Sequence, residues 1–293
     1  MKKKYKISDL LFQKKVKNDG ELQIQHLLSE ILEDKPTVAY PNFLLNGMLY
    51  LKYLKQIDDF SLNYSDGEWI CHLEGLKFVL NSTEELYILK EVFIDGVYNI
   101  EINHPFIFID IGMNVGITSL FFAKRSECEK VVAFEPVQPT LSMAKKNFAK
   151  NEMAQKIQVN ETGLGYPART VTVNYSEENK GHTGINSDVS FIAGIKGIKK
   201  EQLQITDVFE ALKHIVHEKT VLKIDTEGSE YEILERLNNT GLLSRFDIIM
   251  IEWHIKGPSP LQKILLDNNF ELLSTGKHSL KTGMIYAFKK CLV

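Results

Sequence analysis

The chain has 293 residues, of which 44% are hydrophobic and 25% are charged. These fractions are typical of globular proteins and exclude disordered, collagen-like and disulfide-rich classes. The net charge of −3 argues against broad binding to nucleic acid or acidic lipid, because such binding needs a cationic face. No segment approaches the roughly 18 apolar residues of a membrane span. The widely spaced Cys71, Cys128 and Cys291 predict free thiols and a cytoplasmic protein.

Residues 1–75 are predicted to form a mainly helical N-terminal extension. Apolar residues recur at helical spacing within 27–32 and 43–54, and Pro36 and Pro41 interrupt the pattern. The apolar stripe at 43–54 predicts a docking face, so the extension is a candidate for capping a sheet, building a ligand pocket or forming a homodimer interface. Residues 67–80 predict a small hairpin. Ser82 and Glu85 then have the spacing of a capping box that opens a helix.

From residue 105 onward, short apolar runs alternate with helical patterns. The runs lie at 106–111, 130–134, 157–159, 221–224 and 246–251, and the helices are expected at 115–125, 137–150, 206–217 and 229–238. This alternation predicts an α/β, doubly wound, mostly parallel sheet covered by helices on both faces. Residues 270–273 and 284–288, with a turn containing Gly276 between them, predict an antiparallel hairpin at one edge of the sheet.

The most informative motif is Asp110-x-Gly112-x-Asn114-x-Gly116, which follows an apolar run and precedes a helical pattern. The two glycines would let the backbone approach a ligand, the helix N-terminus offers free N–H groups, and Asn114 tolerates a left-handed conformation. Asp110 would suit the cationic amino group of a methionine-derived cofactor better than the pyrophosphate of a dinucleotide. The spacing therefore favours S-adenosylmethionine over NAD, with a purely structural turn as the alternative.

Three further residues are candidate cofactor contacts. Glu135 ends the next apolar run, 25 residues after Asp110, which is the order of distance expected for a carboxylate that binds ribose hydroxyls. Glu161 and Leu164 follow the third run, and a loop in that place faces the cofactor in a doubly wound sheet. We expect them near the adenine edge.

Several ordered motifs resemble the FkbM family of S-adenosylmethionine-dependent methyltransferases. The residues that carry the resemblance are EVFIDGVY at 91–98, IDIGMNVG at 109–116, AFEP at 133–136, LKIDTEGSE at 222–230 and IEWH at 251–254. The resemblance implies a class I methyltransferase domain over residues 76–293 and O-methylation of a sugar, glycan or other secondary-metabolite hydroxyl. Tyr98 in the first of these motifs is a candidate for closing the cofactor pocket, with a packing role as the alternative.

Four polar residues follow the fourth and fifth apolar runs. In class I methyltransferases the end of the fourth strand faces the transferable methyl group, so Asp225 or Glu227 would lie near the acceptor and could take its proton. Glu252 and His254 should reach the same rim, and His254 is a second candidate base because its ordinary pKa is near 6.5. The same four side chains are also possible ligands of a divalent metal. In a structural interpretation, Glu227 and Glu230 stabilise the N-terminus of the following helix.

The segment 168–200 is rich in glycine and polar residues, which predicts a mobile surface loop. It is a candidate acceptor lid with His182, Thr183 and Asn186 as contacts, and a solvated hairpin without a substrate role is the alternative. Asp225-Thr226-Glu227-Gly228 lacks the Asn/Asp-Pro-Pro-aromatic turn of enzymes that methylate base amino groups, so a nucleic-acid substrate is not expected. An NAD(P)-dependent oxidoreductase and a non-catalytic binding module stay as alternatives to a methyltransferase for a small-molecule or glycan acceptor.

Overall fold

The computed structural model describes residues 26–33, 39–175, 199–216, 219–277 and 282–290. The chain divides into two compact units between Asp95 and Gly96. The domain boundary expected near residue 75 lies inside the first unit, just before a strand that begins at Leu76. The functional division of the chain at that point stays a prediction.

The first unit combines helices with a small antiparallel sheet. Residues 26–31 are helical, and the other helices are α2 (Asn42–Asn46), α3 (Met48–Leu54) and α4 (Thr83–Phe93). The predicted hairpin is confirmed by β2 (Glu68–Leu73) and β3 (Leu76–Leu80), and β1 (Ser61–Ser65) adds a third strand that the sequence pattern did not predict. The apolar stripe at 43–54 has two sides: Leu44, Leu51 and Leu54 are buried, whereas Leu45 and Leu49 are exposed.

The capping box predicted for α4 is confirmed. The backbone N–H of Glu85 donates to Ser82 Oγ at 3.4 Å, and the backbone N–H of Ser82 donates to Glu85 Oε2 at 3.1 Å. We expect Ser82→Ala to lower the free energy of unfolding by about 1 kcal/mol, because it leaves a helix N–H without its acceptor. Urea denaturation followed by circular dichroism measures this. Ser65→Ala, which removes only a contact with the neighbouring Asp66, is the control and should have no such effect.

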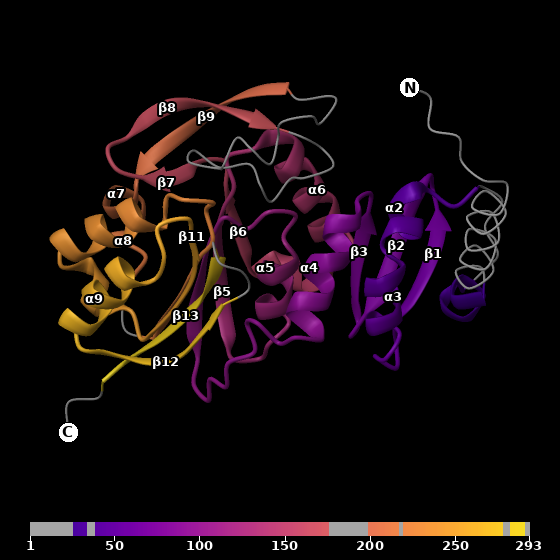
Figure 1. The fold of residues 1–293 in the computed structure, drawn as a ribbon, viewed down its shortest axis with the longest axis horizontal. Coiled ribbons are helices and arrows are strands. Elements are labelled where there is room, and N and C mark those ends of the chain that lie inside the picture. Colours follow the sequence, from indigo (N-terminus) through magenta and orange to yellow (C-terminus); the bar gives the residue numbers. More distant parts are fainter. Residues whose placement is uncertain (1–25, 34–38, 176–198, 217–218, 278–281, 291–293) are drawn as a thin grey trace, which may run out of the picture. The chain divides into compact units, whose positions relative to one another are not determined.

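The second unit is built on a seven-stranded sheet (Figure 1). Its strand order is β12-β13-β11-β10-β4-β5-β6. The strands are β4 (Phe106–Ile111), β5 (Cys128–Phe134), β6 (Ile157–Asn160), β10 (Thr220–Ile224), β11 (Ile248–His254), β12 (Phe270–Lys277) and β13 (Thr282–Lys289). Strands β6, β5, β4, β10 and β11 are parallel to one another. Strand β13 pairs antiparallel with both β11 and β12. The predicted doubly wound sheet and its edge hairpin are confirmed, although Gly276 pairs with Met284 inside β12 and does not lie in the turn.

Helices cover both faces of this sheet, as Figure 1 shows. They are α5 (Ile117–Ala123), α6 (Gln138–Ala149), α7 (Val208–Leu212), α8 (Glu230–Asn239) and α9 (Ser259–Asp267). On one face Phe108 of β4 stacks on Phe122 of α5, with ring centroids 3.8 Å apart. On the other face Ile109 shares a hydrophobic cluster with Leu234 of α8. Alternate residues of one buried strand thus supply both cores, which explains its continuous apolar sequence.

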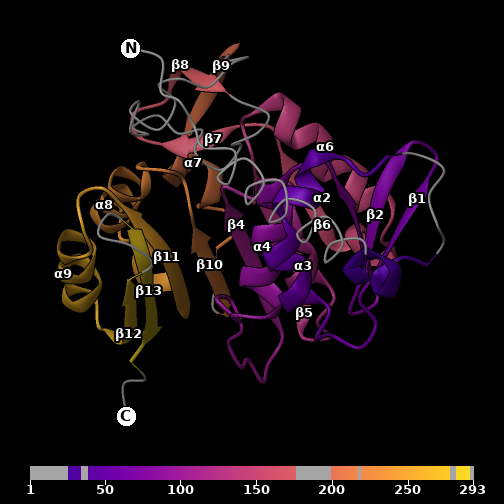
Figure 2. The same cartoon turned by 45° about the vertical axis from the view of Figure 1, so that its right-hand side comes forward.

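A second, three-stranded sheet consists of β7 (Gly163–Gly165), β8 (Arg169–Tyr175) and β9 (Lys199–Asp207). In Figure 2 it lies above the larger sheet, at one end of the second unit. The predicted loop at 168–200 is therefore wrong for 169–175, and the predicted helix at 206–217 is shorter because β9 extends to Asp207. Val173 and Tyr175 alternate with polar residues and are buried against Leu203 and Ile205, a strand pattern hidden by the polar composition of the segment. His182, Thr183 and Asn186 lie outside the described residues.

The sequence predicts that the chain has no membrane-spanning segment and that its cysteines are free thiols. Within the described ranges, no helix has the length and apolar character needed to cross a bilayer. Cys71 and Cys128 are buried free thiols, as predicted, and burial raises the pKa of the Cys128 thiol to about 11. A thiol with so high a pKa is a weak nucleophile at neutral pH.

Candidate functional site

The turn between β4 and α5 has three residues with positive φ. Asn114 (φ 51°) confirms the left-handed conformation expected of it, and Gly112 (φ 79°) and Gly116 (φ 81°) flank it. A Cβ at Gly112 would collide with the backbone carbonyl of Asp225, and one at Gly116 would lie 2.5 Å from the ring of Phe148. The glycines are therefore required by the packing of protein on protein. The sequence interpretation, in which they make room for a ligand, gave a different reason for the same residues.

Asp110 is fully buried and already paired inside the protein. Lys223, its partner in register on the neighbouring strand β10, donates from Nζ to Asp110 Oδ1 at 3.0 Å, and Ser119 Oγ donates to Asp110 Oδ2 at 2.7 Å. The electrostatic argument from the sequence treated this carboxylate as free to attract a cationic amino group. The structure corrects it, because Lys223 supplies the opposite charge.

Lys223 links the turn to the end of β10. Its Nζ also donates to the carbonyl oxygen of Gly112 at 2.7 Å, lies 3.6 Å from Asp225 Oδ2, and stands 5.7 Å from the centroid of the buried Tyr98 ring. Burial alone would lower the pKa of Lys223, but the carboxylates of Asp110 and Asp225 raise it above its usual value. The sequence interpretation missed this residue, although a lysine inside the apolar run Val221–Ile224 was a signal for a buried partner. The pocket-closing role of Tyr98 stays a prediction.

Glu135 and Asn114 present oxygen atoms beside one another at this turn. The carboxylate of Glu135 accepts hydrogen bonds from the backbone N–H groups of Val137 at 2.9 Å and Asn114 at 3.1 Å. Burial raises the pKa of Glu135 to about 7, although these N–H groups favour the ionised form. Asn114 Oδ1 is buried and has no hydrogen-bond partner among the residues that the structure describes. The turn thus holds an oriented carboxylate and an amide oxygen that is free to accept a donor.

The other two expected cofactor contacts lie in different surroundings. Glu161 is exposed and accepts a hydrogen bond from Lys145 Nζ at 2.5 Å. Leu164 is buried in β7 within the hydrophobic core. Their contact with an adenine ring stays a prediction.

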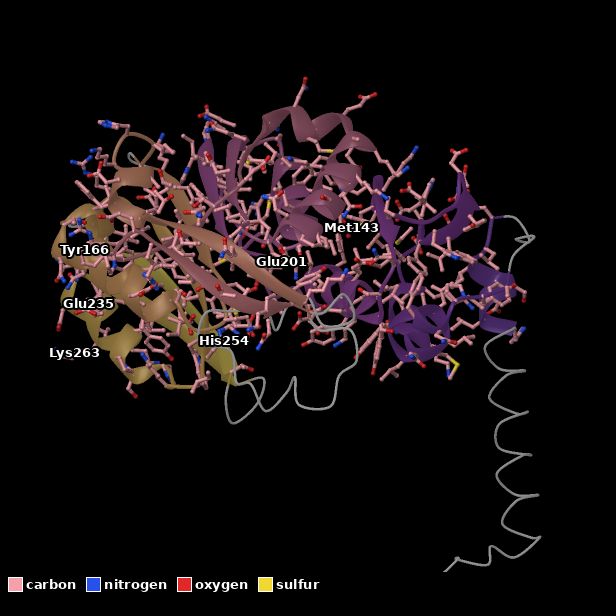
Figure 3. The ribbon with its side chains drawn as sticks, turned by 90° about the horizontal axis from the view of Figure 1, so that it is seen from above. Met143, Tyr166, Glu201, Glu235, His254 and Lys263 are labelled. Atoms are coloured by element: carbon pink, nitrogen blue, oxygen red, sulfur yellow. The ribbon has the colours of Figure 1, made fainter. Side chains whose placement is uncertain are left out.

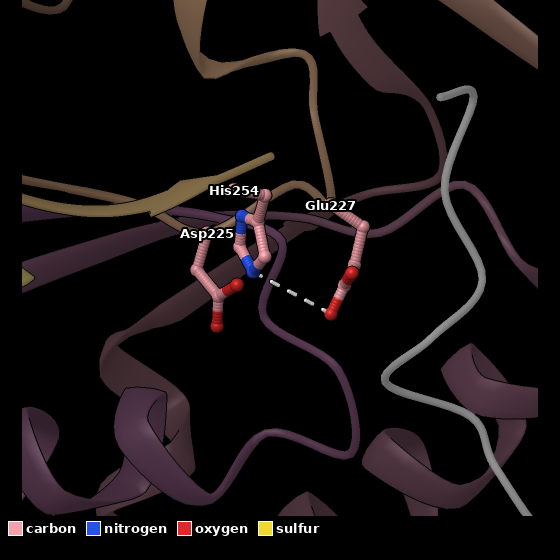
Figure 4. A group of neighbouring side chains, drawn as sticks. All are labelled: Asp225, Glu227 and His254. Carbon is pink, nitrogen blue, oxygen red and sulfur yellow. Dashed lines mark ion pairs between the residues drawn. The ribbon is translucent and has the colours of Figure 1, made fainter. Parts of the chain in front are cut away.

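The four residues predicted from the ends of the fourth and fifth strands are brought together. Asp225 and Glu227 follow β10, and Glu252 and His254 end β11, the strand that pairs with it. Ligand atoms of Asp225, Glu227 and His254 all lie within 4.8 Å of one another (Figure 4). His254 Nε2 lies 3.6 Å from Glu227 Oε1 and 3.8 Å from Glu252 Oε1. Among the residues labelled in Figure 3, His254 is buried, whereas Glu235 and Lys263 are exposed.

Glu230, the first residue of α8, is hydrogen-bonded to the backbone of this cluster. Its carboxylate is fully buried, and it accepts hydrogen bonds from the backbone N–H groups of His254 at 2.7 Å and Gly228 at 2.8 Å. Its Oε1 also lies 3.4 Å from His254 Nδ1. The structural interpretation of the sequence placed Glu230 at the start of a helix, and its hydrogen bonds add that it holds the ends of β10 and β11 together.

His254 carries a proton at neutral pH. Burial alone would lower its pKa, but the carboxylates of Glu230, Glu227 and Asp225 raise the pKa to about 10. A histidine that is already protonated at pH 7 cannot act as a general base. The expected ordinary pKa near 6.5 is therefore wrong, and a role of His254 as the base stays a prediction that this raised pKa argues against.

This raised pKa predicts a pH-dependent stability. Because the pKa is higher in the folded than in the unfolded state, the contribution of His254 is complete below about pH 6.5 and is lost as the pH rises to about 10. We expect the difference in unfolding free energy between wild type and His254→Asn to shrink over this range, as measured by urea denaturation at several pH values. His214→Asn, at an exposed position, is the control. A difference that stays constant with pH for His254→Asn would contradict the charged imidazole.

Comparisons with known proteins identify the family of this chain. The model of the family described as Methyltransferase FkbM domain matches residues 110–272, which is more than half of the chain. The chain is 23% identical over 227 residues to the methyltransferase sdnD of Sordaria araneosa, which covers 67% of this chain and 85% of that protein. It is 24% identical over 171 residues to methyltransferase 1 of Beauveria bassiana, covering 52% and 67%. A solved structure of methyltransferase FkbM from Methylobacillus flagellatus KT is similar with a TM-score of 0.44 and 14% identity, over 90% of this chain and 58% of that chain.

The matched region contains both halves of the site, from the turn that begins at Asp110 to the cluster around His254. The family resemblance noted in the sequence is confirmed, and with it the activity class, S-adenosylmethionine-dependent methyl transfer. The chain belongs to the FkbM family of methyltransferases.

Proposed function

We propose that this methyltransferase transfers the methyl group of S-adenosylmethionine to a hydroxyl of a sugar, a glycan or another secondary metabolite. The observation that supports it is the position of the carboxylate cluster directly beside the β4–α5 turn. The backbone N–H of Asp225 donates to the carbonyl oxygen of Ile111 at 3.0 Å, and its own carbonyl packs against Gly112. A cofactor at the turn and an acceptor at the cluster would therefore be neighbours.

The residues at the turn fit the cofactor. Glu135 is held by two backbone N–H groups, and its carboxylate would accept hydrogen bonds from ribose hydroxyls. Asn114 Oδ1, an acceptor that the described residues leave unsatisfied, would bind a donor such as the cofactor's amino group. S-adenosylmethionine supplies an electrophilic methyl group on a sulfonium. Asp110 contributes indirectly, by holding Lys223 and the turn in place.

The acceptor proton would pass to a carboxylate of the cluster. Asp225 and Glu227 are partly exposed, whereas His254 is buried and protonated. His254 would instead position the carboxylates, since its Nε2 faces Glu227. General-base assistance by such a carboxylate contributes about 10²- to 10⁴-fold to the rate.

We extend this proposal to the acceptor, the cellular location and the N-terminal extension. The acceptor is a small molecule or glycan, the protein acts in the cytoplasm, and its N-terminal extension serves docking or homodimerisation. The family match argues against the NAD(P)-dependent oxidoreductase. A folded but inactive binding module would bind cofactor product without turnover, so an activity assay distinguishes it.

The first experiment is calorimetric titration of the purified chain with S-adenosylhomocysteine, run beside NADH. We expect one-site binding of the former alone. The second measures S-adenosylhomocysteine release from S-adenosylmethionine with a panel of sugars and other hydroxylated metabolites, and identifies the methylated atom by NMR. Methylation of nitrogen or carbon instead of oxygen would overturn the O-methyl assignment.

Asp225→Asn serves as the mechanistic variant in this assay. We expect it to lower kcat by about 100-fold, because the amide cannot take a proton, while S-adenosylhomocysteine affinity is kept. Asp267→Asn, on the exposed side of α9, is the control and should leave kcat unchanged. Equal activity of the two variants would exclude Asp225 as the base.

A further inference from the structure

Among the residues that the structure describes, four carboxylates surround one imidazole at the ends of β10 and β11. Glu227 and Glu252 lie beside His254 Nε2, Asp225 has a carboxylate oxygen within 4.8 Å of the same group, and the buried Glu230 lies beside His254 Nδ1. Lys223, which lies 3.6 Å from Asp225 Oδ2, is shared with the buried Asp110. Several carboxylates gathered at a partly buried site favour binding of a cation, because the attraction is weakly screened there.

The ring nitrogens of His254 are not satisfied by this arrangement. The side chain is 5% exposed, and its Nε2 lies 3.6 Å from Glu227 and 3.8 Å from Glu252, both longer than a hydrogen bond. Its buried Nδ1 lies 3.4 Å from Glu230 Oε1, without the geometry of a hydrogen bond. A buried polar side chain without good partners is uncommon in folded proteins and needs an explanation. Metal coordination at Nε2, which releases the proton that the imidazole carries in the metal-free protein, is one that also accounts for the surrounding carboxylates.

The backbone holds one of these carboxylates in an unfavourable conformation. Glu227 has φ 52°, in the left-handed region that costs a non-glycine residue about 1–2 kcal/mol. Ile255, which follows His254, also has positive φ, at 60°. Strained residues of this kind concentrate at functional sites, where the surrounding structure keeps them in place.

We propose that Asp225, Glu227 and His254 bind one divalent cation, with Glu252 beside it. Two carboxylates and one imidazole suit Mn²⁺ or Mg²⁺, which prefer oxygen-rich ligand sets. Ligands of an octahedral ion at about 2.1 Å lie about 3 Å apart. The present spread of up to 4.8 Å therefore requires only small side-chain rotations, and Figure 4 shows the three groups directed toward one space.

A cation at this place would give the cluster a second role in catalysis. It would bind the acceptor hydroxyl and lower its pKa, so that a weaker base suffices to remove the proton. Only this consequence rests on the proposed function. The binding site itself depends on residues of this chain alone.

The test uses the full-length protein, stripped of metal with EDTA and titrated with Mn²⁺, while electron paramagnetic resonance reports free Mn²⁺. We expect one Mn²⁺ per chain and at least tenfold weaker binding in Asp225→Asn and Glu227→Gln. Glu235→Gln, at an exposed position on α8 (Figure 3), is the matched control and should bind as wild type does. Circular dichroism confirms that each variant is folded.

S-adenosylhomocysteine titration of the same samples separates this inference from the proposed function. A folded protein that binds S-adenosylhomocysteine but no Mn²⁺ up to millimolar concentration overturns the cation site alone. Mn²⁺ binding that persists in the double variant Asp225→Asn/Glu227→Gln also overturns it, because the metal is then held elsewhere. A protein that binds Mn²⁺ at this site but no S-adenosylhomocysteine keeps the cation site and overturns the proposed cofactor.

Discussion

Replacement of Lys223 by methionine is expected to lower the free energy of unfolding by about 3–5 kcal/mol, as removal of one partner of a buried ion pair does. The substitution leaves Asp110, which is fully buried, with only Ser119 as a side-chain hydrogen-bond donor among the residues that the structure describes. It also removes the hydrogen bond from Nζ to the carbonyl oxygen of Gly112. Methionine has a similar length, so packing changes little and the loss reports on charge and hydrogen bonding. Urea denaturation measures the effect.

Two comparisons make this prediction specific. Lys263→Met removes an exposed ion pair with Asp267 on α9, and it should change stability by no more than about 0.5 kcal/mol. The double variant Asp110→Asn/Lys223→Met should be more stable than Lys223→Met alone, because no unpaired charge stays buried. A loss no larger than that of Lys263→Met, or a double variant that is less stable than the single one, would show that the pair does not hold the turn.

Replacement of Glu135 by glutamine is expected to weaken S-adenosylhomocysteine binding by about ten- to a hundredfold. The loss of a charged hydrogen-bond acceptor costs about 1.5–3 kcal/mol, and each 1.4 kcal/mol is tenfold in affinity. The glutamine amide also places an NH₂ group against one of the two backbone N–H donors, those of Val137 and Asn114, that now face the carboxylate. Isothermal titration calorimetry measures the affinity. The control is Glu129→Gln, an exposed position on the same strand β5, which should bind as wild type does.

The raised pKa of Glu135 adds a pH dependence to this result. With a pKa of about 7, the carboxylate is ionised above pH 7 and protonated below it, and the ionised form is the stronger acceptor for ribose hydroxyls. Wild-type affinity should therefore fall as the pH is lowered from 8 to 6, and the affinity of Glu135→Gln should change less over this range. A wild-type affinity that does not depend on pH would argue against a direct contact between Glu135 and the ligand.

Local patterns predicted the larger sheet well. The run at 106–111 coincides with β4, because a strand buried on both faces needs an unbroken apolar sequence. The capping box at Ser82 depends only on residues three apart and was equally readable. By contrast, the alternation in β8 was obscured by its polar side chains, since only pairing with β9 buries Val173 and Tyr175.

The sequence predicted which residues form the candidate site, but it did not predict their chemical states. Asp225, Glu227, Glu252 and His254 could be named because the ends of parallel strands meet at one edge of a sheet. Their chemical states could not, because a pKa depends on the burial and charge of groups that are distant in sequence. His254 illustrates this: the carboxylates that raise its pKa come from 225–230, on a different strand and helix.

The amino-acid sequence by itself determined the family, the α/β class with its mostly parallel sheet and edge hairpin, and the residues that gather at the edge of that sheet. These properties follow from local periodicity and from motifs whose members lie close together in the chain. Only the tertiary structure decided that Asp110 is paired with Lys223, that Gly112 is required by the backbone of Asp225, and that His254 is charged. Each of these depends on contacts between β4, β10 and β11, which no local pattern records, because burial and pairing arise only when strands far apart in sequence become neighbours.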